Sequence, residues 1–238
     1  MKPYTIRLQG GQMLRALHLR RVIRKLMCHN AHILDAGCDT GRDAIYLSAK
    51  YPDSQITGID ISPQAIDEAK SRLSKSKLTN VTFQTTNLLD IDYSEQFDII
   101  YSIEVLEHIS DVGKCLSNFH KALKSGGKII IHVPCPDQKR HFNRFKKNVY
   151  SDHVHVGFKA DELSELLQEN GFRILDVRHT SGWFGSLAWE IFEILRPIAL
   201  LKRILFPLIL LLMICDTLVT NKQGNNVMIT AQKSITHD

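Results

Sequence analysis

Residues 32–41 of the chain, HILDAGCDTG, decide its fold. The first half of this stretch is a short apolar run typical of a buried strand, and Gly37 and Gly41 then break the strand. Glycine lets the backbone adopt positive φ and approach a ligand closely, and a helix that follows presents free N–H groups at its start. The stretch predicts either a loop that binds a nucleotide-like ligand or a plain tight turn between a strand and a helix.

An acidic residue at the end of the next apolar run favours the ligand-binding loop. Residues 56–60, ITGID, predict a second strand, and Asp60 ends it. This is about the separation at which the acid of a dinucleotide-binding fold reaches ribose hydroxyls. Enzymes that use NAD share both features, so the loop and the acid alone do not choose the cofactor.

Apolar runs and helical patterns alternate along the chain that follows, which predicts βαβ units and a parallel sheet. Gly126 and Gly127 are expected to stop the helix before them, and Gly171 to end a later one. The expected helices cover 63–73, 112–123 and 161–170, and the expected strands cover 32–36, 56–60, 81–85, 97–102, 128–133, 172–177 and 226–232.

Two further blocks identify the cofactor class. Residues 97–109, FDIIYSIEVLEHI, are followed by LKSGGK at 123–128. Together they closely resemble the pattern of class I S-adenosylmethionine-dependent methyltransferases, in which a strand beginning FD, a VLEH string and an LKPGG turn before a strand follow one another. The string EVLEH also resembles the ubiquinone-biosynthesis O-methyltransferases. The resemblance covers 33–134 well and extends weakly to 172.

The resemblance implies a fold and a cofactor. The fold is α/β, a Rossmann-like doubly wound, mostly parallel seven-stranded sheet with a C-terminal antiparallel strand, carrying here a late apolar helical insertion. The cofactor is S-adenosyl-L-methionine. Asp35, Gly37 and Gly41 would line its methionine end, Asp60 would bind its ribose hydroxyls through charge-assisted hydrogen bonds, and Ile61 would pack on its adenine.

The resemblance also implies a hydrogen-bond partner for the amino group of the adenine. Asn87 occupies the position at which the family often has an acid, with the backbone of Leu88 beside it, and an amide oxygen can accept the same hydrogen bond. Asp90 is the alternative. The chain departs from the family at Asp39, which replaces the middle glycine of GxGxG. Asp tolerates left-handed backbone better than most residues, but its charge puts donor affinity in question.

Histidines are the candidate bases for an oxygen acceptor. His108 follows the fourth expected strand, on the side where open α/β sheets bind ligands, and ranks first. His153 lies in a later loop where the family often has a histidine near the acceptor, and His155 is close to it. Each of them is also consistent with a purely structural hydrogen-bonding role.

A metal site is the alternative for the same string. Glu104, Glu107 and His108 have i, i+3, i+4 spacing and would face one way if helical. In the ubiquinone-biosynthesis enzymes these positions are tied to magnesium, but the string is widespread in the superfamily without a metal. We therefore predict no metal.

The length of 238 residues favours a single methyltransferase domain over 1–238. Within it we expect an N-terminal helical cap at 1–31, a donor-binding core at 32–134, an acceptor-side loop at 135–160 and the apolar insertion at 183–219. The uncharged stretch 204–215 is shorter than the about 20 residues needed to span a bilayer, and Pro207 lies within it. The insertion is expected to pack on the domain, form a homodimer surface or lie on a membrane with Trp183 and other aromatic residues at the headgroups.

Charge and cysteine content indicate which partners and which cellular location to expect. The net charge is +5, and basic residues cluster at 20–25 and 139–147. Such clusters fit an acidic substrate, lipid headgroups or a solvated surface, and no aromatic-basic pattern of RNA-binding proteins accompanies them, so no nucleic acid partner is expected. The five cysteines show no paired spacing, which favours a reduced, cytoplasmic setting. A peripheral position on the cytoplasmic surface of a membrane is compatible with this expectation.

The sequence therefore predicts methyl transfer from S-adenosyl-L-methionine to a small-molecule or lipid-linked acceptor, at oxygen. Nitrogen or carbon acceptors are the alternative within enzymes. A non-catalytic donor-binding or scaffold protein is the alternative outside them, because of Asp39. An NAD-dependent dehydrogenase ranks lower because the second half of the chain lacks a hydride-transfer constellation.

Overall fold

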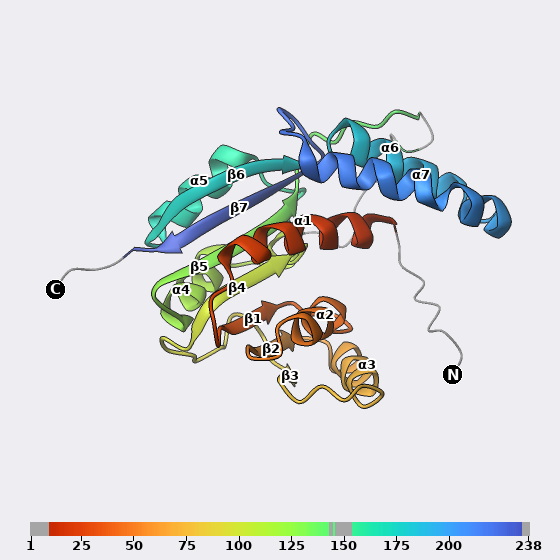
Figure 1. Cartoon of the computed structure of the whole chain (residues 1–238). Helices are drawn as coiled ribbons and strands as arrows, with labels where there is room; N and C mark the ends of the chain where they lie inside the picture. Colours follow the sequence, from red (N-terminus) through yellow and green to blue (C-terminus); the bar gives the residue numbers. More distant parts are fainter. Residues whose placement is uncertain (1–9, 143–144, 146–153, 235–238) are drawn as a thin grey trace. The chain divides into compact units, whose positions relative to one another are not determined.

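The computed structural model describes residues 10–142, 145 and 154–234 (Figure 1). Seven strands form one sheet in the order β3-β2-β1-β4-β5-β7-β6. β2, β1 and β4 pair in parallel with their neighbours, and the β7 arrow points opposite to β5 and β6 in Figure 1. The predicted doubly wound, mostly parallel sheet with a C-terminal antiparallel strand is confirmed. The strands are β1 His32–Ala36, β2 Gln55–Asp60, β3 Val81–Thr85, β4 Phe97–Ile103, β5 Leu123–Pro134, β6 Phe172–Thr180 and β7 Asn226–Lys233.

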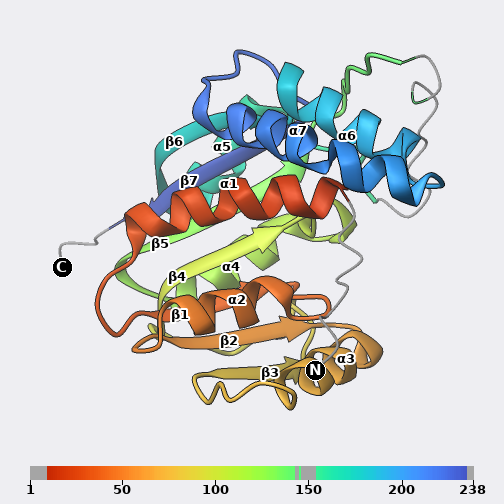
Figure 2. The same cartoon turned by 45° about the vertical axis from the view of Figure 1, so that its right-hand side comes forward.

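Helices cover both faces of this sheet. Figure 2 shows α2 on the near face and α4 and α5 on the far face. The helices are α2 Arg42–Lys50, α3 Pro63–Leu73, α4 Val112–Ala122 and α5 Ala160–Glu169, and a short 3-10 helix, η1, covers Leu106–His108. Local caps fix their starts: the Ser62 hydroxyl accepts from the Ala65 N–H at 3.2 Å, and the Asp111 carboxylate accepts from the Lys114 N–H at 2.9 Å.

The expected boundary at Gly126 and Gly127 is wrong, and the strand expected over 172–177 extends to Thr180. The helix predicted for 112–123 ends at Ala122, and β5 begins immediately at Leu123, so Gly126 and Gly127 lie inside a strand and do not stop the helix. The pairing of β4 with β5 is irregular between Phe97, which pairs with Leu123, and Ile99, which pairs with Lys128. A Cβ on Gly127, inside this irregular segment, would lie 2.9 Å from the Lys124 carbonyl oxygen, so a larger residue there would force a shift.

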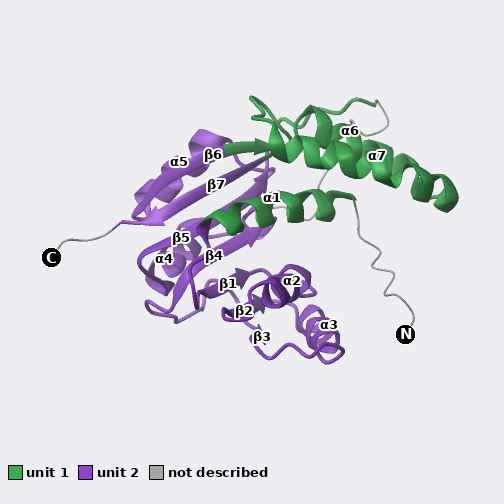
Figure 3. Cartoon of the chain, in the orientation of Figure 1, with its two compact units in different colours: residues 1–25, 137–149, 178–226 green, residues 26–136, 150–177, 227–238 purple. Residues whose placement is uncertain are grey.

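The chain divides into two compact units, coloured separately in Figure 3. The larger consists of 26–136, 150–177 and 227–238 and contains most of the sheet. The smaller consists of 1–25, 137–149 and 178–226. The single domain predicted for 1–238, with its internal boundaries, stays a prediction.

The smaller unit contains three long helices with their own apolar core. α1 covers Gly10–Leu26, and the predicted apolar insertion forms α6 Trp183–Ile194 and α7 Ala199–Leu218, which pack against each other. The core of this unit consists of Met13, Leu14, Ala188, Phe192, Leu195, Ile209 and Met213. Among the described residues, no helix has the length and apolar composition needed to cross a membrane.

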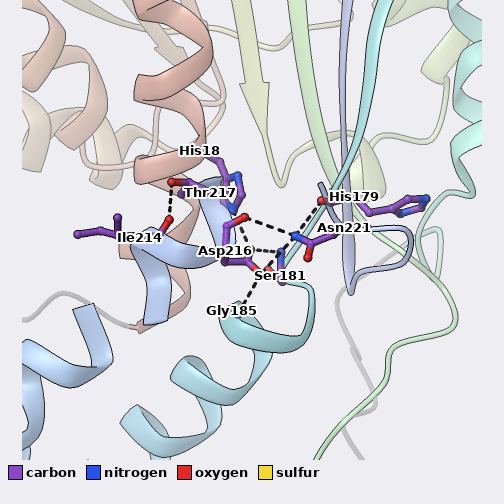
Figure 4. Close-up of polar contacts among 8 residues, drawn as sticks. All are labelled: His18, His179, Ser181, Gly185, Ile214, Asp216, Thr217 and Asn221. Carbon is purple, nitrogen blue, oxygen red and sulfur yellow. Dashed lines mark hydrogen bonds and ion pairs between the residues drawn. The ribbon is translucent and has the colours of Figure 1, made fainter. Parts of the chain in front are cut away.

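A buried carboxylate joins the helices of the smaller unit. Asp216 of α7 is fully buried, and its Oδ2 lies 2.9 Å from Nε2 of His18 on α1. The backbone N–H groups of Ser181 and Gly185 donate to the same carboxylate, each at 3.0 Å, and the Asn221 amide donates at 3.3 Å (Figure 4). Gly185 lies in the first turn of α6, where free N–H groups favour a negative charge.

Candidate functional site

The glycine loop between β1 and α2 is tied to the end of β2. The N–H groups of Gly37 and Cys38 both donate to the Ile59 carbonyl oxygen, at 2.8 and 2.9 Å. Gly37 has φ 84° and Gly41 has φ 70°. A Cβ on Gly37 would lie 2.3 Å from Val105, and one on Gly41 would lie 2.5 Å from Phe83. Both glycines are therefore required by backbone conformation and by close packing.

Asp60 is held by backbone N–H groups on both of its oxygens. Oδ2 accepts from the Asp39 N–H and Oδ1 accepts from the Ser62 N–H, each at 2.9 Å. Each carboxylate oxygen has about two lone-pair sites, so both can still accept a hydroxyl. The carboxylate is fixed in orientation and partly exposed, as a group that binds a vicinal diol must be.

Asp35 is a buried acid at the end of β1, only 4% exposed. Burial raises the pKa of its carboxyl group well above the ordinary value; the neighbouring Tyr101 hydroxyl opposes this rise, and the charges of Asp43, Asp60 and Asp39 add to it. Its Oδ2 has no hydrogen-bond partner among the described residues. A buried acceptor without a partner, beside a glycine loop, indicates a place for a cationic or N–H donor ligand.

Asp39 adopts the conformation that the family assigns to glycine. Its φ is 44°, and its N–H makes the hydrogen bond to Asp60 described above. The side chain is exposed, with the Thr40 hydroxyl 3.4 Å from its carboxylate. Asp39 therefore adopts the backbone conformation expected of a glycine at this position. Compared with glycine, it adds a carboxylate at the mouth of the loop.

We expect Asp39→Gly to keep donor affinity within about threefold of the unchanged protein, whereas Asp39→Val weakens it by about tenfold. A β-branched residue pays roughly 1–2 kcal/mol for left-handed backbone, and leaving that conformation removes the N–H from Asp60. Calorimetric titration of both variants measures the difference. Equal dissociation constants for the glycine and valine variants would contradict a conformational role for this position.

The predicted adenine-side residues follow β2 and β3. Ile61 is 68% exposed, an apolar side chain presented directly after Asp60. The Asn87 Oδ1 accepts from the Leu89 N–H at 3.0 Å, which leaves one lone-pair site on that oxygen, and Leu88 is buried. The Thr86 N–H donates to the Asp60 carbonyl oxygen at 2.9 Å, so the segment that contains Asn87 starts beside the ribose acid.

Asp90 is directed elsewhere. One of its carboxylate oxygens lies 3.9 Å from the Lys114 ammonium of α4. The adenine role of Asn87, with Asp90 as the alternative, stays a prediction.

The structure describes two of the three candidate histidines, His108 and His155. His108 is exposed at the end of η1, directly beyond β4, and β4 pairs with β1. It therefore follows the same sheet edge as the glycine loop. His153 lies outside the described residues. The neighbouring His155 donates its backbone N–H to the Glu107 carbonyl oxygen at 3.0 Å, and its Nε2 lies 3.1 Å from the Ile109 carbonyl oxygen. The 154–155 segment is thus placed beside the segment that contains His108.

The helical spacing behind the metal alternative is not realised. Glu104 has φ 57° and directly follows β4, so it is not on the same helical turn as Glu107 and His108. Glu107 is buried and His108 is exposed, and a Glu104 oxygen lies 3.1 Å from Nδ1 of His132. Within the described ranges, no three His, Cys, Asp or Glu side chains are grouped so as to hold a metal ion.

Comparison with known sequences supports the same interpretation. A family described as "Methyltransferase domain" matches residues 29–171. O-methyltransferase cnsE of Penicillium expansum is 33% identical over 165 residues, which are 65% of this chain and 56% of that relative. Ubiquinone biosynthesis O-methyltransferase of Coxiella burnetii (strain Dugway 5J108-111) is 28% identical over 178 residues, 69% of this chain and 73% of that one. The chain thus spans little more than half the length of the first relative.

Solved structures show the same fold. Haemonchus contortus phosphoethanolamine N-methyltransferase 2, in complex with S-adenosyl-L-methionine, has a TM-score of 0.69 at 20% identity, covering 97% of this chain and 58% of that one. The [4+2]-cyclase SpnF has a TM-score of 0.67 at 19% identity, covering 92% and 81%. The strand order, the glycine loop tied to Asp60 and the family match over 29–171 together show that this chain belongs to the methyltransferase domain family, within the class I S-adenosylmethionine-dependent enzymes.

Proposed function

We propose that the chain binds S-adenosyl-L-methionine at the glycine loop and transfers its methyl group to an oxygen of a small-molecule or lipid-linked acceptor. The observation that carries this proposal is the unpartnered Oδ2 of buried Asp35, next to a loop whose glycines leave no room for side chains and whose end is fixed to Asp60. Family membership supports the choice of cofactor.

The chemical groups of the donor match the groups of the site. The Asp35 carboxylate would accept from the ammonium of the methionine part, which supplies the missing partner and favours the ionised carboxylate. The Asp60 oxygens would accept from the two ribose hydroxyls through their remaining lone pairs. The start of α2, directly after Gly41, offers free N–H groups to a carboxylate.

The protein has little covalent chemistry to perform. The bound donor supplies a methyl group that is electrophilic because it is attached to a sulfonium. The residues of the chain hold the acceptor oxygen in line with it, and such positioning supplies roughly 7–11 kcal/mol of the barrier reduction. His108, beyond β4 on the edge that carries the loop, would accept the proton that the acceptor hydroxyl loses.

Oxygen is the preferred acceptor atom because the curated relatives described above are named as O-methyltransferases. The fold alone does not choose the reaction, since a cyclase shares it. A second candidate function, donor binding without transfer, is favoured by Asp39, because its exposed carboxylate adds charge to the loop mouth.

Calorimetry with S-adenosyl-L-methionine, followed by transfer of a labelled methyl group to phenolic, glycan and polyprenyl acceptors, tests the proposal. Micromolar binding with transfer supports it. Failure to bind the donor at millimolar concentration overturns the cofactor assignment, and binding without transfer to any acceptor or cell extract favours the second candidate.

Once an acceptor is found, we expect His108→Ala to lower kcat by about 10²-fold, the lower end of what general-base catalysis contributes. The dissociation constant of the donor should not change, because His108 lies outside the glycine loop. Added imidazole should restore part of the rate. His29→Ala, at an exposed histidine in the turn before β1, is the matched control. An unchanged kcat in His108→Ala would remove this residue from the mechanism and leave His153 as the candidate.

A further inference from the structure

Helix α7 has two apolar faces, and its own unit uses only one. Ile209 and Met213 belong to the core of the smaller unit, and Asp216, on the same side, is fully buried. At 100° per residue, five other side chains lie within 80° of one another on the opposite side. These are Leu200, Ile204, Leu208, Leu211 and Leu218, with exposed fractions of 72%, 63%, 51%, 55% and 59%.

The exposed apolar stripe is a candidate contact surface. The largest exposed apolar patch of a soluble protein, on the order of 300–600 Å², often binds another protein, a ligand or a membrane. The buried stripe already supplies the contacts that fold the unit, so folding does not explain the exposed one. Pro207 lies on the exposed side as well, and no charged residue interrupts the helix between 204 and 215.

Charge around α7 favours an anionic surface. Arg203 is exposed in the second turn of α7, about 60° from Leu200 around the helix axis, and Arg196, which is paired with Glu193, precedes the helix. Lys202 lies on the opposite side, with its ammonium 5.1 Å from the centre of the Phe192 ring. The only acid of α7 is Asp216, whose charge is buried and satisfied within the unit. Long cationic side chains beside an apolar helix face bind the phosphates of lipid headgroups while the apolar residues enter the bilayer boundary.

An exposed tryptophan lies at the other end of the helix. Trp183 is 60% exposed and begins α6, and the first turn of α6 contacts α7 at Asp216, where the Gly185 N–H donates to the carboxylate. Tryptophan is enriched at the headgroup level of membranes because its ring is apolar and its N–H is polar. The stripe therefore has an exposed cation, Arg203, beside its start, and the neighbouring helix α6 begins with an exposed aromatic residue.

The dimensions of the stripe argue against a second copy of the chain. A helix of 20 residues is about 30 Å long, and a face about 10 Å wide offers on the order of 300 Å². Stable dimers bury about 800 Å² per partner. A lipid surface has no such minimum area, because each inserted side chain contributes separately.

We propose that α7 lies on the surface of an anionic lipid bilayer, with its stripe of Leu200, Ile204, Leu208, Leu211 and Leu218 at the headgroup boundary. Binding to the membrane requires neither the donor nor an acceptor, so it can be tested independently of methyl transfer. It would bring the enzyme to the surface at which lipid-linked acceptors are found.

Flotation tests the proposal with two kinds of vesicle, phosphatidylcholine alone and phosphatidylcholine mixed with phosphatidylglycerol. The unchanged protein should float with the anionic vesicles, less with the neutral ones, and less at high salt. The double variant Ile204→Gln/Leu208→Gln should weaken binding by about tenfold or more. Arg203→Glu should weaken binding to the anionic vesicles selectively.

The matched control is Leu175→Gln/Val177→Gln, which changes two exposed apolar residues of β6, 40% and 43% exposed, and should float like the unchanged protein. All variants should melt at the same temperature, because their side chains lie outside the cores. Protein that stays in the dense fraction with anionic vesicles overturns the proposal. So does a dimer in solution that Ile204→Gln/Leu208→Gln dissociates, because it would assign the stripe to a second copy.

Discussion

Asp60→Ala is expected to weaken the binding of S-adenosyl-L-methionine by about a thousandfold. Two hydrogen bonds to a charged carboxylate are worth about 1.5–3 kcal/mol each, and both are lost together. The same substitution leaves the N–H groups of Asp39 and Ser62 without their acceptor and so loosens the loop. Calorimetry measures the change, with Asp53→Ala, at an exposed residue of the turn before β2, as the control.

Asp60→Asn separates the two contributions. One amide oxygen can still accept a hydroxyl, but the NH₂ group faces a backbone N–H that needs an acceptor, so the affinity should fall between those of the unchanged protein and Asp60→Ala. The melting temperature of Asp60→Ala without donor should change little compared with the loss of binding. Donor affinity that survives Asp60→Ala within about threefold would show that the ribose is bound elsewhere.

Asp216→Ala is expected to lower the free energy of unfolding by about 3–5 kcal/mol, because several donors lose their common acceptor and each unpaired buried donor costs about 1–3 kcal/mol. His18 and the N–H groups of Ser181 and Gly185 all donate to this carboxylate, and the substitution leaves them buried without an acceptor (Figure 4). Urea denaturation measures the change, and Asp67→Ala, at an exposed position of α3, is the control.

His18→Ala should cost less than Asp216→Ala, because it removes one of several donors and leaves the carboxylate held by the others. The double variant should be less destabilised than the sum of the two single variants, since both lose the same 2.9 Å contact. Strict additivity, or a loss below about 1 kcal/mol for Asp216→Ala, would show that the network contributes little to folding.

Much of the larger unit could be predicted because its determinants are local. The limits of α3 and β3 are those expected from the sequence, since Ser62 and Pro63 mark the helix start and the strand is a short alternating run. The start of β5 could not be predicted in the same way. It depends on the pairing of Leu123 with Phe97 before an irregular segment, and the glycine pair looks locally like the end of a helix.

The candidate site also has features that the sequence predicts and features that only the structure shows. Asp35, Asp60 and the two loop glycines follow from spacing and from the family resemblance, because a strand, a turn and an acid recur at fixed separations. The missing partner of Asp35 and the bond from Asp39 to Asp60 do not follow, since they depend on burial and on positive φ. The helical spacing assumed for Glu104, Glu107 and His108 is wrong, because the sequence does not show that Glu104 leaves the helical path.

The insertion was the least predictable part. Its apolar composition indicates helices, but which face of α7 is buried depends on contacts with α1 and α6. The network around Asp216 left no signal in the sequence, because its donors come from four separate places in the chain.

The contact between His18 and Asp216 also sets an order of events during synthesis. The two residues are 198 positions apart. A ribosome that adds about 5–20 residues per second needs roughly 10–40 s to make the stretch between them. Throughout that time α1 has emerged without the acceptor for its histidine and without the apolar partners that α6 and α7 supply. α1 is therefore made long before the helices that it packs against and is among the last segments to dock, so we expect a chaperone to act on it.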